Sequence, residues 1–184
     1  MSAAAQYAQD ERLTELAQKF SRISGIRSSF IQTNYVSFMD EKIVSAGFFE
    51  FHKPDRLIWQ YDTPVFFRLE YAGGKASFSN APSGPQQPGG AGSGREAEIA
   101  AVLGRNLMQW IALDLKAIQR DYSVRLVDEA PLRLRFELKK SSPGAIQNIA
   151  LKFSADRADI QEVLLEGTDG DYILLEFTNS EHYE

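Results

Sequence analysis

The first apolar pattern along the chain has the spacing of an amphipathic helix. Between positions 13 and 20, apolar residues recur at steps of three and four, and charged residues fill positions between them. This spacing places the apolar side chains on one face of a helix. The stripe consists of Leu13, Leu16, Ala17 and Phe20. We expect the helix to end before Gly25, because glycine favours helix termination.

From Ser28 to Asn80 the hydrophobic period changes to two, which is typical of strands that bury one face. Leu57, Trp59 and Tyr61, for example, alternate with their neighbours along one such strand. The expected strands cover residues 30–38, 43–51, 57–61 and 65–71, and a fifth starts at residue 76. No connection of ten or more residues separates these segments, so antiparallel hairpins are favoured over parallel crossovers.

The rest of the chain changes pattern twice more. Residues 81–94 hold ten Gly, Pro or Ser in 14 positions, which predicts a flexible surface loop. A second helical stripe runs over residues 96–118, with an interruption expected at 114–116. Strands then return at 132–138, 149–153, 160–166 and 172–178, and the first of these shows the clearest alternation in the chain.

This order of elements predicts one α+β domain over residues 1–184, with a large antiparallel sheet and few helices. A flat open sheet of about ten strands would expose an apolar face or curl. We therefore expect the sheet to curl, with the helices on its concave side. Such an arrangement leaves a cavity lined by apolar side chains.

Composition and charge narrow the possible functions. The net charge of the 184 residues is −5, which argues against a nucleic-acid-binding protein because such proteins need a basic surface. The chain has no cysteine, so disulfides, thiol catalysis and thiolate metal sites are excluded. Its two histidines, His52 and His182, offer little for a zinc site or a serine–histidine relay.

The start of the chain is compatible with two cellular locations. No apolar run approaches the length needed to span a bilayer, and the first residues lack the basic and apolar regions of a signal peptide. The protein is therefore either cytoplasmic or a mature form whose export signal has been removed.

The sequence offers little evidence for a phosphate-binding, metal-binding or catalytic site. The glycines of residues 89–94 precede a helix, but no Lys-Ser/Thr follows them, so a flexible loop is favoured over a phosphate site. Asp169 and Asp171, with Glu166 and Glu176, suggest a cation site, but solvated carboxylates around a hairpin turn are the preferred interpretation. We expect His52 to be a structural polar residue. The sequence thus predicts no catalytic residue, metal site or cofactor, and no enzyme.

Aromatic density is the unusual feature of the chain. Residues 48–78 contain nine of its 21 aromatic side chains. A well-filled core explains this density, and so does an apolar cavity for an acyl chain or a similar ligand. Composition alone favours the well-filled core, and the ligand cavity stays an alternative.

Several motifs in the first half of the chain resemble the outer-membrane lipoprotein carrier family, LolA. The matching segments, in order, are Phe30-Ile-Gln32, Ser45-Ala-Gly47, Phe49-Glu-Phe51-His-Lys53-Pro54, Asp55-Arg-Leu57-Ile-Trp59, Pro64, Gly74-Lys75 and Phe78-Ser-Asn80-Ala-Pro82. Their order and spacing match the family over roughly residues 10 to 82. The second half is similar mainly in its pattern of helix and alternating strands.

The resemblance implies an unclosed antiparallel β-barrel of about 10–11 strands, with helices covering its concave face. It implies a periplasmic carrier, a chaperone for the acyl chains of lipoproteins or a similar lipid. An inner-membrane complex would release the cargo and an outer-membrane acceptor would receive it. We expect a monomer that binds no nucleic acid. Another lipid-like cargo, or a lipid-sensing regulatory domain of the same fold, remains an alternative.

The expected ligand-binding residues line the cavity that this fold would form. They are Phe30, Phe49, Phe51, Lys53, Leu57, Trp59, Tyr61, Phe67, Leu107, Trp110 and Ile111. Family members carry arginine at the position of Lys53, where it bonds backbone groups of the helical lid. Lysine keeps the charge but lacks the planar five-donor fork, so the resemblance implies a weaker latch at Lys53.

Overall fold

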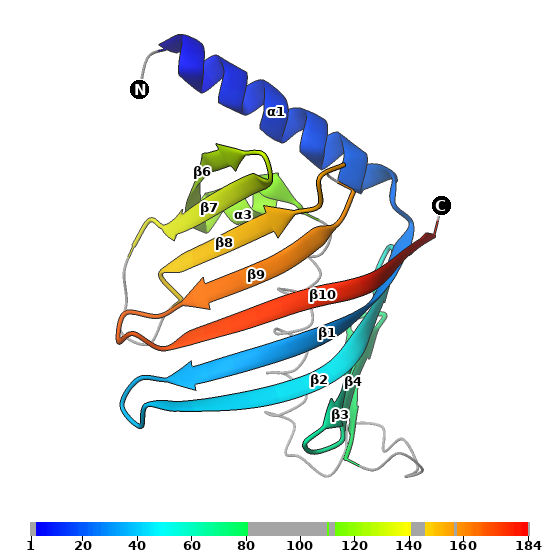
Figure 1. Ribbon diagram of the computed structural model, residues 1–184. Helices are drawn as coiled ribbons and strands as arrows, with labels where there is room; N and C mark the ends of the chain where they lie inside the picture. Colours follow the sequence, from blue (N-terminus) through cyan, green and yellow to red (C-terminus); the bar gives the residue numbers. More distant parts are fainter. Residues whose placement is uncertain (1–2, 81–109, 111–112, 141–145, 157, 184) are drawn as a thin grey trace. The chain divides into compact units, whose positions relative to one another are not determined.

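The computed structural model describes residues 3–80, 110, 113–140, 146–156 and 158–183, with side chains from residue 11 onward. Helix α1 (Ala3–Arg22) comes first, and five strands follow it (Figure 1). These are β1 (Gly25–Val36), β2 (Glu41–His52), β3 (Arg56–Thr63), β4 (Phe67–Ala72) and β5 (Lys75–Ser79). Helix α3 (Leu115–Asp121) precedes β6 (Tyr122–Glu129), β7 (Leu132–Leu138), β8 (Asn148–Phe153), β9 (Ile160–Glu166) and β10 (Tyr172–Tyr183).

The ten strands hydrogen-bond in the order β5-β4-β3-β2-β1-β10-β9-β8-β7-β6. Strands β5 and β6 stand at the two ends of this order and do not pair with each other, so the sheet is not closed. Every pairing whose register is defined is antiparallel. The prediction of an α+β fold with an unclosed antiparallel sheet is therefore confirmed.

Two local expectations needed adjustment. Strand β6 was not among the predicted strands, although its side chains alternate between half-buried and exposed over Tyr122–Leu126. The interruption expected at 114–116 is wrong in its bounds, because Leu115 and Lys116 already belong to α3 and the non-helical residues are Leu113 and Asp114. Leu113 has a positive φ of 49°, and Asp114 caps the next helix by accepting a hydrogen bond from the Ala117 amide at 3.1 Å. Residues 81–94, predicted to be a flexible loop, and most of the predicted helix at 96–118 lie outside the described residues.

Residue contacts divide the chain into two compact units. Unit 1 comprises Met1–Arg22, Gln32–Ile43 and Leu113–Phe177, and unit 2 comprises Ile23–Ile31, Val44–Ala112 and Thr178–Glu184. The long strands β1, β2 and β10 contribute residues to both units. The single domain expected over residues 1–184 stays a prediction.

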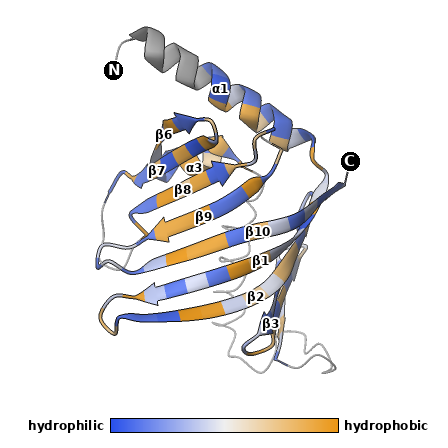
Figure 2. Ribbon diagram, in the orientation of Figure 1, coloured by the Kyte–Doolittle hydropathy of each residue, from blue (hydrophilic) through white to orange (hydrophobic). Residues whose placement is uncertain are grey.

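Unit 1 is built around one apolar face of strands β7 to β9. Apolar and polar positions alternate along β7, as Figure 2 shows, and Leu134 and Phe136 are almost completely buried. Helix α1 covers part of this face with its predicted stripe, in which Leu13, Leu16 and Phe20 are buried and Ala17 is half-buried. The ring of Phe20 meets that of Phe153 edge to face at 5.9 Å. The helix is therefore held to the sheet mainly by apolar contact.

Candidate functional site

Strand register places the predicted site residues of β2, β3 and β4 on one face of the sheet in unit 2. In the central row, Phe49 of β2 lies opposite Trp59 of β3, which lies opposite Leu69 of β4. The neighbouring rows follow from the two-residue period of each strand. They are Phe51–Leu57–Tyr71 and Gly47–Tyr61–Phe67. The alternation seen in the sequence therefore becomes a single surface.

Aromatic rings contact one another continuously across this surface, from β1 to β5. We call the six residues that form it the aromatic wall: Phe30, Phe49, Trp59, Tyr61, Phe67 and Phe78. The ring of Phe30 lies 4.7 Å from that of Trp59 and 5.3 Å from that of Tyr61. Trp59 stacks on Phe49 at 5.6 Å. Phe67 joins Tyr61, at 6.4 Å, to Phe78, at 5.7 Å. These centroid separations are typical of favourable aromatic pairs.

The wall depends on a close backbone approach at Gly47. The pairing of β2 with β3 shifts register between Ala46 and Gly47. A Cβ atom added at Gly47 would lie 1.8 Å from the carbonyl oxygen of Gln60 and 2.9 Å from the Cα of Tyr61. Only glycine fits this position without moving β3.

Burial decreases along the wall. Phe30, Phe49 and Trp59 are only 2%, 4% and 6% exposed. Phe51 and Leu57, which belong to the same face, are buried as well. Tyr61, Phe67 and Phe78 are half-buried. The wall is thus core-like at the Phe30 end and partly accessible at the Phe67 end.

The opposite face of these strands carries charged side chains together with Phe48 and the buried Ile58. Arg68 donates to Glu70 at 2.6 Å and to Gln60 at 2.8 Å. Arg27 pairs with Glu50 at 3.3 Å and lies over the Phe48 ring. These charged side chains of unit 2 therefore pair on the face away from the aromatic wall.

His52 belongs to the same face. Its Nε2 lies 2.9 Å from the Glu50 carboxylate, and its ring stacks on Tyr183 at 5.0 Å. These contacts agree with the expected structural role of His52.

Lys53 follows the last residue of β2. Its backbone amide donates to the Ser24 carbonyl at 2.8 Å, which ties the strand end to the start of β1. The residue is exposed as a whole, yet partial desolvation of its ammonium group lowers the pKa of Lys53.

The remaining predicted site residues come from the second helical segment. Trp110 is helical and half-buried, whereas Leu107 and Ile111 lie outside the described residues. Sequence reasoning did not include Phe78 in the site, although it counted Phe78 in the aromatic cluster. Phe78 lies two residues after Ala76 on the short strand β5, and this two-residue spacing could have placed Phe78 on the same face as the other rings.

Two of the carboxylates near the β9–β10 turn, those of Asp171 and Glu166, have side-chain or backbone partners. Asp171 accepts hydrogen bonds from the amide and the hydroxyl group of Ser37, both at 2.7 Å, and these bonds lower the pKa of its carboxyl group. Glu166 pairs with Arg135 at 3.1 Å. Within the described residues, no three His, Asp or Glu side chains gather into a metal-binding group. None of the described helices is long and apolar enough to cross a membrane.

Comparison with known proteins gives matches by structure. No family model matches the chain, and no curated protein matches it. The solved structures that it resembles include a LolA-superfamily protein. That protein, from Nitrosomonas europaea, is 10% identical, with 94% of each chain covered and a TM-score of 0.46. A DUF1329 family protein from Desulfovibrio piger is 10% identical over 94% of this chain and 92% of its own, with a TM-score of 0.45.

A third similar structure is MucB from a Pseudomonas aeruginosa MucA/MucB complex. It is 12% identical and has a TM-score of 0.47. The match covers 95% of this chain but only 56% of the MucB chain.

Proposed function

We propose that this protein is a periplasmic carrier that holds the acyl chains of lipoproteins against the aromatic wall and delivers them toward the outer membrane. The observation that carries the proposal is the continuous run of ring contacts from Phe30 to Phe78 on one face of unit 2. A flexible acyl chain needs an extended apolar surface and few directional bonds. The carrier motifs between residues 30 and 82 support the same function.

Binding has to be reversible in such a carrier. Complete burial of a 16-carbon acyl chain contributes roughly 12 kcal/mol, at about 0.8 kcal/mol per methylene group. A protein that retained all of this free energy could not release its cargo. Opening the buried end of the wall costs free energy that offsets part of this gain. A ligand that reaches Phe30 or Trp59 must first displace the protein atoms that exclude water there.

The half-buried end of the wall is the proposed point of entry. Tyr61 and Phe67 are accessible without rearrangement of the deeper rings. A chain that enters there moves along the wall toward Trp59. By the LolA resemblance, an inner-membrane releasing complex would load the protein and an outer-membrane acceptor would unload it, without covalent chemistry.

Trp59 fluorescence tests this proposal directly. The chain has two tryptophans, so a Trp110→Phe background leaves Trp59 as the only indole. We expect a fatty acid brominated along its chain to quench Trp59 saturably. Phe67→Ser should weaken binding about tenfold, since it removes part of one ring contact worth roughly 1.4 kcal/mol. Val65→Ser, at a side chain that is 72% exposed, is the control and should bind normally.

Two results would count against an acyl carrier. Failure to quench Trp59 in a folded protein would remove the wall as the binding surface. Tighter binding of a polyene or isoprenoid than of a triacylated peptide would replace the lipoprotein by another lipid-like cargo.

Lys53 should control release if it acts as a latch on the closed, empty state. Lys53→Leu removes a charge-assisted bond worth about 1.5 to 3 kcal/mol, so a fluorescent acyl probe should dissociate roughly 10 to 100 times more slowly. Lys53→Arg should leave the rate unchanged or raise it, because arginine offers more donors. Stopped-flow displacement measures all three rates. Equal rates would make Lys53 an ordinary surface residue.

A further inference from the structure

The turn between β1 and β2 carries the most exposed large apolar side chain in the described part of the chain. Phe38 is 96% exposed, and the adjacent Met39 is 52% exposed. We call these two residues the apolar tip. Isolated exposed apolar residues are common, but two adjacent ones at a turn form a convex surface that water solvates poorly.

Unit 1 holds this tip in a fixed position. The amide and hydroxyl groups of Ser37 both bond Asp171 on the β9–β10 turn, and the Tyr35 hydroxyl group donates to Asp40 at 2.9 Å. The ring of Tyr35 stacks on Tyr172 at 5.0 Å. These contacts join two turns that are distant in sequence. These contacts hold the residues on either side of the tip, so its backbone loses little conformational entropy on binding.

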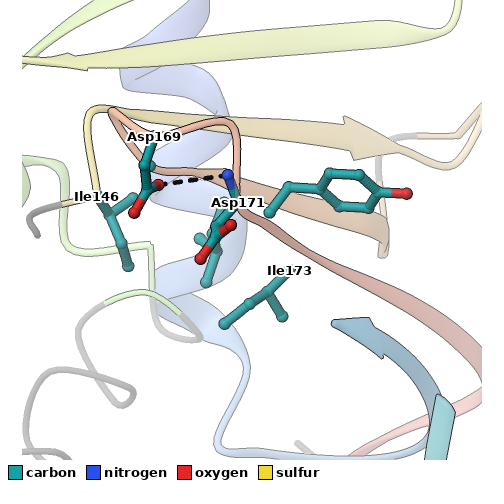
Figure 3. Close-up of a pocket in the computed structure, with 7 residues that line it drawn as sticks. Ile146, Asp169, Asp171 and Ile173 are labelled. Carbon is teal, nitrogen blue, oxygen red and sulfur yellow. Dashed lines mark hydrogen bonds between the residues drawn. The ribbon is translucent and has the colours of Figure 1, made fainter. Parts of the chain in front are cut away.

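A small pocket of about 170 Å³ is lined by residues of the β9–β10 turn and of the strands beside it (Figure 3). Side chains of Ile146, Leu165 and Ile173 give it an apolar lining, and Asp169 and Asp171 add carboxylates. Asp171 is also the residue that anchors Ser37, so the pocket and the apolar tip are neighbours. The pocket is large enough for one side chain with an aliphatic stem and a charged end.

Most charged residues next to these features in sequence are acidic, and Lys42 is the exception. Asp40 and Glu41 follow the apolar tip directly, and Asp169 and Asp171 belong to the facing turn. Among the described residues, neither Asp169 nor Asp171 forms an ion pair with lysine or arginine. The lowered pKa of Asp171 keeps its carboxylate ionised at neutral pH. A binding partner therefore meets four carboxylates around two apolar side chains.

From these contacts, we propose that the apolar tip and the adjacent pocket form a docking surface for a basic protein segment. The segment would offer an apolar recess to Phe38 and a lysine or arginine whose stem lies on Ile173 and whose cation pairs with Asp171. Charge complementarity favours this occupant over two others. A second copy of the chain would bring the same carboxylates together, and an anionic membrane would repel them.

A labelled 14-residue helical peptide made only of leucine and lysine is the probe for this surface, with a leucine–glutamate peptide as its counterpart. Fluorescence anisotropy should show micromolar binding of the lysine peptide and none of the glutamate peptide. Phe38→Ser should weaken binding at least tenfold. Asp169→Asn should weaken it about threefold and reduce its salt dependence. Val127→Ser, at an exposed apolar residue of β6, should bind like the unmodified protein.

Three results would overturn the proposal. One is equal binding of the lysine peptide by the unmodified protein and by Phe38→Ser, checked with Met39→Ser. Another is Phe38-dependent sedimentation with vesicles of phosphatidylethanolamine and phosphatidylglycerol, which would make the tip a membrane contact. The third is concentration-dependent self-association that Phe38→Ser abolishes, which would make the surface a homodimer interface. Phe67→Ser should leave peptide binding intact, so this test is independent of the proposed carrier function.

Discussion

Gly47→Ala is expected to lower the free energy of unfolding by about 3 kcal/mol or more, because overpacking against backbone cannot be relieved by side-chain rotation. The added methyl group would lie 1.8 Å from the Gln60 carbonyl oxygen, so β2 and β3 must separate. Their separation also disturbs the Trp59 row of the aromatic wall. Urea denaturation followed by circular dichroism measures the loss.

Gly73→Ala is the matched control for this substitution. Gly73 has a positive φ of 57°, but nothing lies within 4 Å of the position where its Cβ would be. Its replacement adds only backbone strain, about 1 kcal/mol. If both variants lost equal stability, the close approach of Gly47 to β3 would not be a constraint on the fold.

Phe30→Ala should cost about 3 to 5 kcal/mol of folding free energy, the usual range for truncation of a buried phenylalanine. Phe30 is 2% exposed, and its ring contacts both Trp59 and Tyr61. Its removal should open a cavity beside the indole, and the Trp59 emission maximum should shift to longer wavelength. Thermal and urea unfolding give the stability change.

Phe38→Ala tests the same chemical change at an exposed position. With Phe38 96% exposed, the free energy of unfolding should change by no more than about 0.5 kcal/mol. Comparable losses in the two variants would mean that Phe30 does not lie in a rigid core.

Sequence patterns predicted the helices and strands that bury one face, because burial of one face sets the spacing of apolar residues within the element. The alternation over residues 132–138 became β7, because every second side chain faces the buried side of unit 1. The stripe of Leu13, Leu16 and Phe20 is buried for the equivalent reason in a helix. The antiparallel pairing followed from the short connections between strands, whereas the lack of closure was implied by the resemblance to LolA.

The unpredicted features depend on contacts between distant parts of the chain. Strand β6 was missed because its polar and apolar residues alternate only over its first half, before the register shift between Leu126 and Asp128. The contact of Phe30 with Trp59 spans two strand pairings and could not be inferred from either strand alone. The decrease in burial from Trp59 to Phe67 likewise depends on the three-dimensional surroundings of each ring.

The order of strands has a consequence for how the chain folds as it is synthesised. Every pair of neighbours in the sheet is also consecutive in sequence, except β1 and β10. In unit 2 the buried Ser28 hydroxyl group on β1 lies 2.9 Å from the Thr178 carbonyl and 3.0 Å from the Ser180 hydroxyl group, both on β10. The two runs of hairpins can therefore form early and locally, but they cannot join until β10 has left the ribosome. During synthesis, β1 must therefore wait for its partner with one edge unpaired while nine of the ten strands are already made.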